Sequence, residues 1–345
     1  MRLIDFRSDT VTKPTDGMLK AMFMTEVGDD VFGEDPTVVR LEKKMAKLFG
    51  MDAGLFVPSG TMGNQLALHI HSKPGDEVIC DFQSHIYQYE SGGLAANSGL
   101  QVKLLQGDRG RINAEQIKMA INADFDWLSK SRVVSIENTC NKAGGSAYEL
   151  DELINISRLA KEKNLKLHLD GARIFNGLLA KNLKTTDLTG LFDSISICLS
   201  KGLGAPVGSV LVGDSDFIKE ARRVRKRWGG GMRQAGYLAA AGLYALEHHI
   251  DRLILDHQKA NILANSLRQL PFVKDILPVE SNIVLFHLSS TEDVNTMLYE
   301  LEVNGIKAIQ FGPTAIRMIT HLDISDENLK LTMEVLQKIK ISNTH

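Results

Sequence analysis

The sequence predicts a two-domain α/β protein, in which a mostly parallel sheet is followed by a smaller α+β unit. Strand-like apolar runs alternate with helical patterns between about residues 56 and 212, which is typical of a parallel sheet with right-handed crossovers. The pattern changes near residue 250, and a length of 345 residues favours two domains. We therefore expect an arm over residues 1–13, a large domain over 14–250 and a small C-terminal domain over 251–345.

Capping residues and apolar periodicity predict the helices. Asp35 is a suitable N-cap before Pro36 at the first helical position, and apolar residues then recur at helical spacing up to Gly50. The arm before Pro14 is too polar for a core strand. Asn304–Gly305 is a good helix C-terminus. Further helices are expected over 14–22, 114–121, 150–163, 234–270 (one long helix), 294–304 and 329–339.

Short apolar runs, many of them β-branched, predict the strands. Most of them end in polar or glycine-containing loops. In open α/β sheets, ligands bind at the carboxyl ends of the strands. Strands are expected over 77–81, 101–105, 132–137, 167–170, 193–198, 207–212, 282–287 and 316–319.

The composition excludes several classes of function. A net charge of −2, with 24% charged and 43% hydrophobic residues, gives no reason to expect a nucleic-acid or membrane partner. The basic stretch Lys219–Arg227 is expected to be a solvated or subunit-facing helix surface. Three cysteines are too few for a disulfide framework, and no apolar leader or membrane-spanning run is present in the sequence. We expect a cytoplasmic protein.

Two predicted strand ends carry charged residues that suit one cofactor. Lys201 follows strand 193–198, and Asp170 ends strand 167–170. Alone, a solvated loop lysine and a structural aspartate are the simpler interpretations. Together they match pyridoxal 5′-phosphate (PLP), whose aldehyde condenses with a lysine and whose pyridinium nitrogen pairs with a carboxylate. We therefore predict a PLP site, without a metal, in which Lys201 and Asp170 are catalytic.

Three further segments could complete this site. The run from Ser59 to Thr61 precedes a helix, where backbone N–H groups and the helix dipole can bind a phosphate; an ordinary helix cap is the alternative. His85 follows a strand and could lie on a ring or move a proton, or it could be structural. Arg317, in a strand of the small domain, could form a structural bridge or a fork onto a carboxylate.

With these residues assembled, the chain resembles the low-specificity L-threonine aldolases, which are PLP enzymes of the aspartate-aminotransferase fold (fold type I). The resemblance covers nearly the whole chain. It implies a PLP-dependent aldehyde-lyase that cleaves L-threonine or L-allo-threonine to glycine and an aldehyde through a Schiff base on Lys201. The most specific motifs are Arg7–Thr12, Gly28–Pro36, Pro58–Asn64, His168–Arg173, Ser200–Leu203 and Gly230–Gln234.

The resemblance also implies roles for the matched residues. His85 would stack on the cofactor ring and could act as a base, and Arg233 could reach the phosphate from a neighbouring subunit, since such enzymes are usually homodimers or homotetramers with active sites at subunit interfaces. We predict that Arg317 holds the substrate α-carboxylate in a bidentate fork. The implied cofactor contacts are Ser59, Gly60, Thr61, His85, Asp170, Arg173, Lys201 and Arg233. The implied substrate contacts are Ser8, Arg173 and Arg317.

Two positions depart from the family pattern. Cys140 stands where the family commonly has a histidine, and Trp127 falls about where several members carry a second active-site histidine that is associated with the substrate hydroxyl. These replacements leave the preferred substrate side chain open. They also keep an alternative reaction open, namely β-elimination from a serine-like or aromatic amino acid to give pyruvate and ammonia. A non-catalytic PLP-binding protein is the other alternative.

Overall fold

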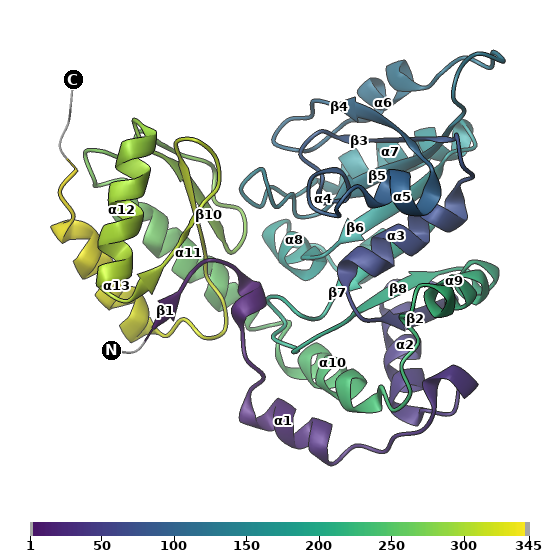
Figure 1. Ribbon diagram of the computed structural model, residues 1–345, viewed down its shortest axis with the longest axis horizontal. Helices are drawn as coiled ribbons and strands as arrows, with labels where there is room; N and C mark the ends of the chain where they lie inside the picture. Colours follow the sequence, from purple (N-terminus) through teal and green to yellow (C-terminus); the bar gives the residue numbers. More distant parts are fainter. Residues whose placement is uncertain (1–2, 342–345) are drawn as a thin grey trace.

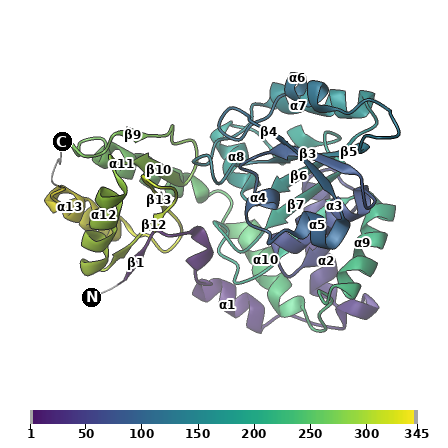
Figure 2. The same ribbon diagram turned by 45° about the horizontal axis from the view of Figure 1, so that its top comes forward.

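The computed structural model describes residues 3–341 and consists of two packed units with the N-terminal arm running between them (Figure 1). The larger unit is built on a seven-stranded sheet, and the smaller unit on a four-stranded sheet. A second view shows the same separation (Figure 2). None of the helices within residues 3–341 has the length and hydropathy needed to cross a membrane.

The large sheet is mostly parallel, which confirms the expected fold class. Its strand order is β2-β8-β7-β6-β5-β3-β4. Strand β8 runs antiparallel to its neighbours β2 and β7, and the remaining neighbours are parallel. The strands are β2 (Ala53–Val57), β3 (Glu77–Asp81), β4 (Gln101–Leu105), β5 (Ser131–Glu137), β6 (Lys166–Gly171), β7 (Ser194–Cys198) and β8 (Ser209–Gly213).

Helices cover both faces of this sheet, because side chains alternate between the faces along each strand. On β2, Phe56 packs in the core that includes α2 and α7, whereas Leu55 and Val57 pack in the core that includes α3 and α9. The helices of this unit are α1 (Asp16–Phe23), α2 (Pro36–Leu48), α3 (Gly60–His71), α4 (His85–Gln88), α5 (Gly93–Ser98), α6 (Ala114–Ala120), α7 (Leu150–Glu162), α8 (Ile174–Ala180), α9 (Ser215–Arg227) and α10 (Gly236–His248).

The smaller unit packs helices against an antiparallel sheet of order β12-β13-β10-β9. Its core is separate from that of the large sheet. Its helices are α11 (Leu253–Leu267), α12 (Thr291–Val303) and α13 (Asp326–Lys338). Its strands are β9 (Asp275–Ile276), β10 (Ile283–His287), β11 (Ile306–Lys307), β12 (Ile309–Gln310) and β13 (Ala315–Ile319).

Two expectations about individual elements are wrong. The arm does form a short strand: β1 (Ile4–Asp5) pairs with β11, and Ile4 and Phe6 are buried in the small core because they alternate with outward-facing polar residues. The long helix expected over 234–270 is two helices, broken between α10 and α11, where the ring of His249 bonds the carbonyl oxygen of Leu203 at 2.7 Å. The predicted domain boundaries at residues 13 and 250 stay predictions.

Candidate active site

The predicted site residues from the large unit gather at the carboxyl ends of its parallel strands. Asp170 lies near the end of β6, and Lys201 lies three residues beyond the end of the neighbouring strand β7. The loop after β7 is closed by backbone hydrogen bonds from Leu199 to Gly208 and from Gly204 to Lys201. These bonds hold Lys201 on the same side of the sheet as Asp170.

The amine of Lys201 has no ion-pair partner within the described residues. It donates to the thiol of Cys198, with Nζ and Sγ 3.6 Å apart. Its carbonyl oxygen accepts a bond from the hydroxyl of Thr12 at 3.3 Å, which ties the loop to the N-terminal arm. The side chain is partly buried, so the amine is positioned without being committed to a protein carboxylate.

The start of helix α3 lies directly against β7. Ser59 is the N-cap of α3 and accepts a hydrogen bond from the backbone N–H of Met62 at 3.2 Å. A Cβ on Gly60 would lie 2.5 Å from the sulfur of Cys198, and a Cβ on Gly63 would collide with the hydroxyl of Ser196. Both glycines are therefore needed for this close approach. The approach brings the anion-binding end of the helix to the strand that leads to Lys201.

A network of buried polar groups surrounds Asp170. The amide of Asn64 donates to Oδ2 of Asp170 at 2.8 Å and to Oε1 of Glu90 at 2.9 Å. Gln65 donates to the other oxygen of Glu90 at 2.6 Å, and the ring of His85 contacts Glu90 at 2.9 Å. Ligand atoms of His85, Glu90 and Asp170 lie within 4.8 Å of one another. Because protein donors already bind both carboxylates, this cluster needs no cation to be stable.

His85 lies among acidic side chains. Burial by itself would lower its pKa, but the hydrogen bond to Glu90 and the charges of Asp170 and Glu137 outweigh burial and raise that pKa. Its ring lies 5.6 Å from that of Tyr89, tilted by 41°. Glu137 fixes the loops on either side: it accepts hydrogen bonds from the backbone N–H of His85 and from that of Asn141, both at 2.9 Å.

Arg173 is part of a buried ion pair with the N-terminal arm. Its guanidinium donates to both oxygens of Asp9 at 2.7 Å, and the two side chains are 5% and 0% exposed. Asn282 of the small unit adds a bond to Asp9 at 3.2 Å. The pKa of Asp9 is held well below its usual range, since the charge of Arg173 outweighs the effect of burial. This ion pair anchors the arm where the two units meet.

Arg317 lies on the opposite side of this junction and has no carboxylate partner within residues 3–341. Its guanidinium donates to the side-chain oxygen of Asn141 at 2.9 Å and to the carbonyl oxygen of Arg7 at 3.0 Å. Its Nε is buried without a partner among the described residues. Burial, followed by the charge of Arg173, lowers the pKa of Arg317 to about 10. A buried cation in this state favours binding of an anion.

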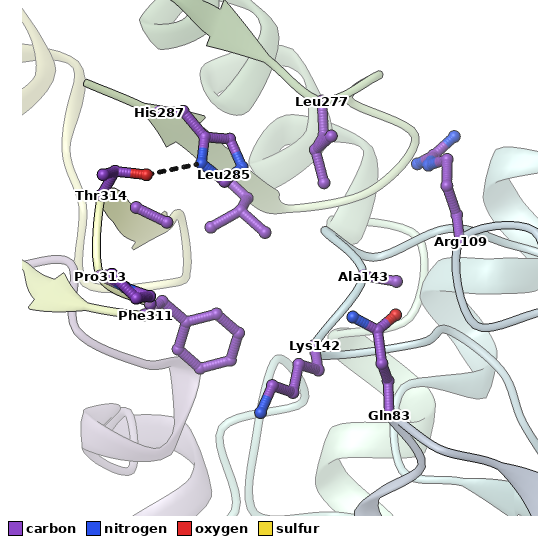
Figure 3. Close-up of a pocket in the computed structure, with 12 residues that line it drawn as sticks. Gln83, Arg109, Lys142, Ala143, Leu277, Leu285, His287, Phe311, Pro313 and Thr314 are labelled. Carbon is purple, nitrogen blue, oxygen red and sulfur yellow. Dashed lines mark hydrogen bonds between the residues drawn. The ribbon is translucent and has the colours of Figure 1, made fainter. Parts of the chain in front are cut away.

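A pocket of about 280 Å³ lies where the two units face each other. Phe311 lines this pocket, and its ring centroid lies 4.1 Å from the guanidinium carbon of Arg317. Figure 3 shows Lys142 and Gln83 of the large unit opposite Phe311 and His287 of the small unit. Phe311 therefore belongs both to the lining of this pocket and to the surroundings of Arg317.

The remaining predicted residues lie in different surroundings. Ser8 sits on the arm between Arg7, which bonds Arg317, and Asp9, which bonds Arg173; its hydroxyl accepts from the backbone of Thr10 at 3.2 Å. Arg233 is exposed and pairs with Asp29 at 2.9 Å. The loop before Arg233 lies against the first turn of α3, because a Cβ on Gly230 would collide with the sulfur of Met62.

The structure places neither departure from the family pattern against the substrate site. Trp127 is 77% exposed and stacks on Phe125 in the loop before β5, so it lies at the amino end of that strand, opposite the site. Trp127 therefore lies away from Lys201 and Asp170 of its own chain. Cys140 is buried in the large core, where its thiol lies 3.0 Å from the carbonyl oxygen of Glu137. Burial raises the pKa of the Cys140 thiol, so it is not a poised acid or base.

Sequence reasoning missed several residues that organise the site. Asn64 and Asp9 lie inside motifs that were noted for other residues, and Asn141 follows the strand end that includes Glu137. Glu90 could have been predicted, because it lies five positions after His85 and a carboxylate near a candidate base often orients that base. Their partners are distant in sequence, so their roles are visible only in the fold.

Comparison with known proteins agrees with this geometry. The chain matches the β-eliminating lyase family over residues 5–291. It is 40% identical to low-specificity L-threonine aldolase 1 of Arabidopsis thaliana, covering 99% of this chain and 98% of that protein. It is 41% identical to the low specificity L-threonine aldolase of Escherichia coli O157:H7, covering 95% and 96%.

Solved structures share the fold. The structure of Leishmania major threonine aldolase superposes with a TM-score of 0.84 at 24% identity, and covers 97% of this chain and 99% of that one. At this identity the likeness shows the fold, whereas the sequence relatives show the family. The chain belongs to the β-eliminating lyase family and, within it, groups with the low-specificity L-threonine aldolases.

Proposed function

We propose that this protein is a PLP-dependent aldehyde-lyase that cleaves L-threonine and L-allo-threonine to glycine and acetaldehyde. One observation carries the proposal. The neighbouring strands β6 and β7 bring Asp170 and Lys201 to one edge of the sheet, beside the N-terminus of α3. Across the junction of the two units, Arg317 is buried without a carboxylate partner among the described residues. A non-catalytic carrier would have no use for such a cation.

The residues present fit PLP. The amine of Lys201 has no carboxylate partner in the described chain, and the backbone amides at Gly60 and Thr61 lie in the first turn of α3, where helices leave N–H groups free for a phosphate. Asp170 would bind the pyridinium nitrogen, and the ring of His85 would lie on the cofactor face. When bound, the cofactor supplies an aldehyde that condenses with amines and a ring that accepts electrons from a bond breaking at Cα.

Residues of this chain would then direct the cleavage. Arg317 would bind the substrate α-carboxylate in a bidentate fork and would so fix the orientation of the bonds at Cα. His85, held by Glu90, accepts the proton of the β-hydroxyl as the Cα–Cβ bond breaks, and a proton is returned to Cα to give glycine. Ser8 and Arg173 flank the carboxylate from the arm and the large unit.

We further propose that two or four copies assemble with active sites at their interfaces, with a homotetramer as the specific expectation. Support comes from Arg233, which is exposed and lies on a loop packed against α3, so it could serve a phosphate in a neighbouring copy. We also propose a cytoplasmic location, which the three free cysteines support. Light scattering of the purified protein and fractionation of cells would test these two statements.

Product analysis tests the reaction. The PLP-loaded protein should release glycine and an aldehyde from L-threonine, L-allo-threonine and phenylserine, and Lys201→Ala should abolish this release. Borohydride reduction followed by peptide mass mapping should find the cofactor on Lys201. Release of pyruvate and ammonia from L-serine, without glycine from threonine, would instead establish β-elimination. An unlabelled Lys201 would contradict both reactions.

A further inference from the structure

Behind Asp170, a single line of buried hydrogen bonds runs through the large unit. Nε2 of His168 lies 3.1 Å from the side-chain oxygen of Asn64, and Nδ1 of His168 lies 2.9 Å from the hydroxyl of Ser194. The same hydroxyl lies 2.8 Å from Nε2 of His71. Asn64, His168 and Ser194 are between 0% and 2% exposed. Each of these buried groups has a hydrogen-bond partner within the chain.

The chemistry of the groups fixes the direction of every bond in this line. Both hydrogens of the Asn64 amide go to carboxylates, those of Asp170 and Glu90, so the amide oxygen must face His168. That oxygen accepts only, so His168 must carry its proton on Nε2. Burial lowers the pKa of His168 to about 4, so the ring is neutral and its Nδ1 accepts the hydroxyl proton of Ser194.

We propose that His168 is a positioning residue for the cofactor site: as a fixed Nε2–H donor it orients the amide of Asn64, which in turn holds Asp170 and Glu90. The proposal rests on the function proposed above, since it assigns a use to Asp170. The amide of Asn64 thereby holds two groups of the proposed cofactor site. It holds Asp170 for the pyridinium nitrogen, and through Glu90 it holds the ring of His85.

The line also has an electrostatic consequence. Every bond from His71 to Asp170 points its hydrogen towards the carboxylate end, so the bond dipoles add in one direction. The line therefore presents its donor end to the residue that would pair with the pyridinium nitrogen. A neutral apolar residue at position 168 would leave the oxygen of Asn64 without a donor and free the amide to turn.

A pair of substitutions separates this role from simple packing. His168→Leu removes the donor. His168→Gln keeps an amide N–H near the place of Nε2 and cannot titrate. His257→Leu is the matched control: His257 is also buried and neutral, with a pKa lowered by burial to about 4, and its ring contacts the amide of Asn176 outside this line. Thermal unfolding of all three variants reports their folding.

We expect His168→Leu to weaken PLP binding by about 10-fold, the size usual when a group that orients a ligating residue is lost, and to shift the visible absorption of the bound cofactor. His168→Gln should restore both properties, and His257→Leu should leave both unchanged. If His168→Gln behaves like His168→Leu, the donor role is wrong. If His168→Leu does not fold, the His168→Gln variant alone decides the question. Retained PLP binding and cofactor absorption in that variant support the donor role, and their loss overturns it.

Nitrogen NMR of the cofactor-free protein tests the line independently of PLP. With ¹⁵N-labelled histidine, His168 should show a protonated Nε2 and an unprotonated Nδ1 at neutral pH, and the His168→Gln spectrum identifies its signals. A proton on Nδ1, or a charged ring, would overturn the inference. A wild-type protein that shows the expected ring but binds no PLP would contradict the proposed function and leave the hydrogen-bond line standing.

Discussion

The large-unit side and the small-unit side of the site each contain a buried arginine, and the two arginines differ in their partners. Arg173 of the large unit and Arg317 of the small unit are 6% and 7% exposed, and both donate to the side-chain oxygen of Asn141. Arg173 also has two short bonds to Asp9, whereas Arg317 has a carbonyl oxygen, an aromatic face and an orphan Nε. The charge of Arg173 is therefore balanced within the fold, whereas Arg317 has no carboxylate partner within residues 3–341.

This difference divides the site by function. On the large-unit side, protein groups bind the carboxylates of Asp9, Glu90 and Asp170, so these three carboxylates have hydrogen-bond donors before any ligand binds. On the small-unit side, an anion would complete the set of contacts. A substrate carboxylate would therefore draw the two units onto the same molecule, and substitutions on the two sides should have different consequences.

The largest expected effect comes from breaking the balanced charge. Asp9→Asn leaves Arg173 buried without a counter-charge, which should cost about 3–5 kcal/mol of unfolding free energy. Chemical denaturation of wild type and variant measures this difference. Asp5→Asn on the same arm is the matched control, because its partner Arg7 has a side chain 44% exposed and such pairs contribute about 0.2–1 kcal/mol. Equal losses in the two variants would contradict the comparison.

The same pair predicts a pH dependence. The pKa of Asp9 is lower in the folded protein than in the unfolded chain, so its contribution is complete above the unfolded value of about 3.9 and is lost as the pH falls below it. The stability gap between wild type and Asp9→Asn should therefore be widest near neutral pH and should narrow in acid. A gap that widens in acid would show that the ion pair is not its source.

A second substitution on the large-unit side tests the close contact between α3 and β7. Gly60→Ala places a methyl group against the sulfur of Cys198 and should cost about 1–3 kcal/mol, with weaker retention of PLP. Adding Cys198→Ala removes the obstructing sulfur and should recover part of both losses. Denaturation and cofactor titration of the single and double variants test this. A double variant with no recovery would mean that the glycine is needed for another reason.

Arg317→Lys sharpens the small-unit side of the comparison. The substitution keeps the positive charge and loses the planar fork, so kcat/KM should fall about tenfold or more, as for a loss of roughly 1.4 kcal/mol of transition-state binding. Stability and the cofactor absorption should remain, because no carboxylate of the described chain depends on Arg317. Unchanged kcat/KM, or loss of PLP, would make Arg317 structural and leave Arg173 as the next candidate.

The smallest expected change is a shift in a pH profile. Burial alone would lower the pKa of His85, but the hydrogen bond that its ring donates to Glu90 and nearby carboxylate charges hold this pKa above its ordinary value. If neutral His85 accepts the hydroxyl proton, activity rises with pH through that pKa. Glu90→Gln removes one carboxylate and should move this rise to lower pH. A steady-state pH–rate profile measures the shift, and an unmoved rise would exclude His85 as the titrating base.

Part of the fold and of the candidate site could be predicted from the sequence alone, because that part depends on the local pattern of apolar and polar residues. Alternating runs predicted the mostly parallel sheet, and residues after strand ends predicted that Lys201 and Asp170 share one edge. The break between α10 and α11 could not be predicted, since no glycine or proline marks it and the turn is held by a tertiary bond from His249 to Leu203. The strand at Ile4–Asp5 was also missed, because its partner is three hundred residues away.

The sequence by itself determined which chemical groups the site has: a lysine, an aspartate and a helix start beside them, because short-range periodicity and capping follow from local backbone geometry. Only the tertiary structure decided how those groups are used. Asp9 and Asn64 act on partners 164 and 106 positions away. Whether a buried arginine is neutralised or left for a ligand depends on which carboxylates the fold brings within a few ångströms, and no local pattern encodes that distance.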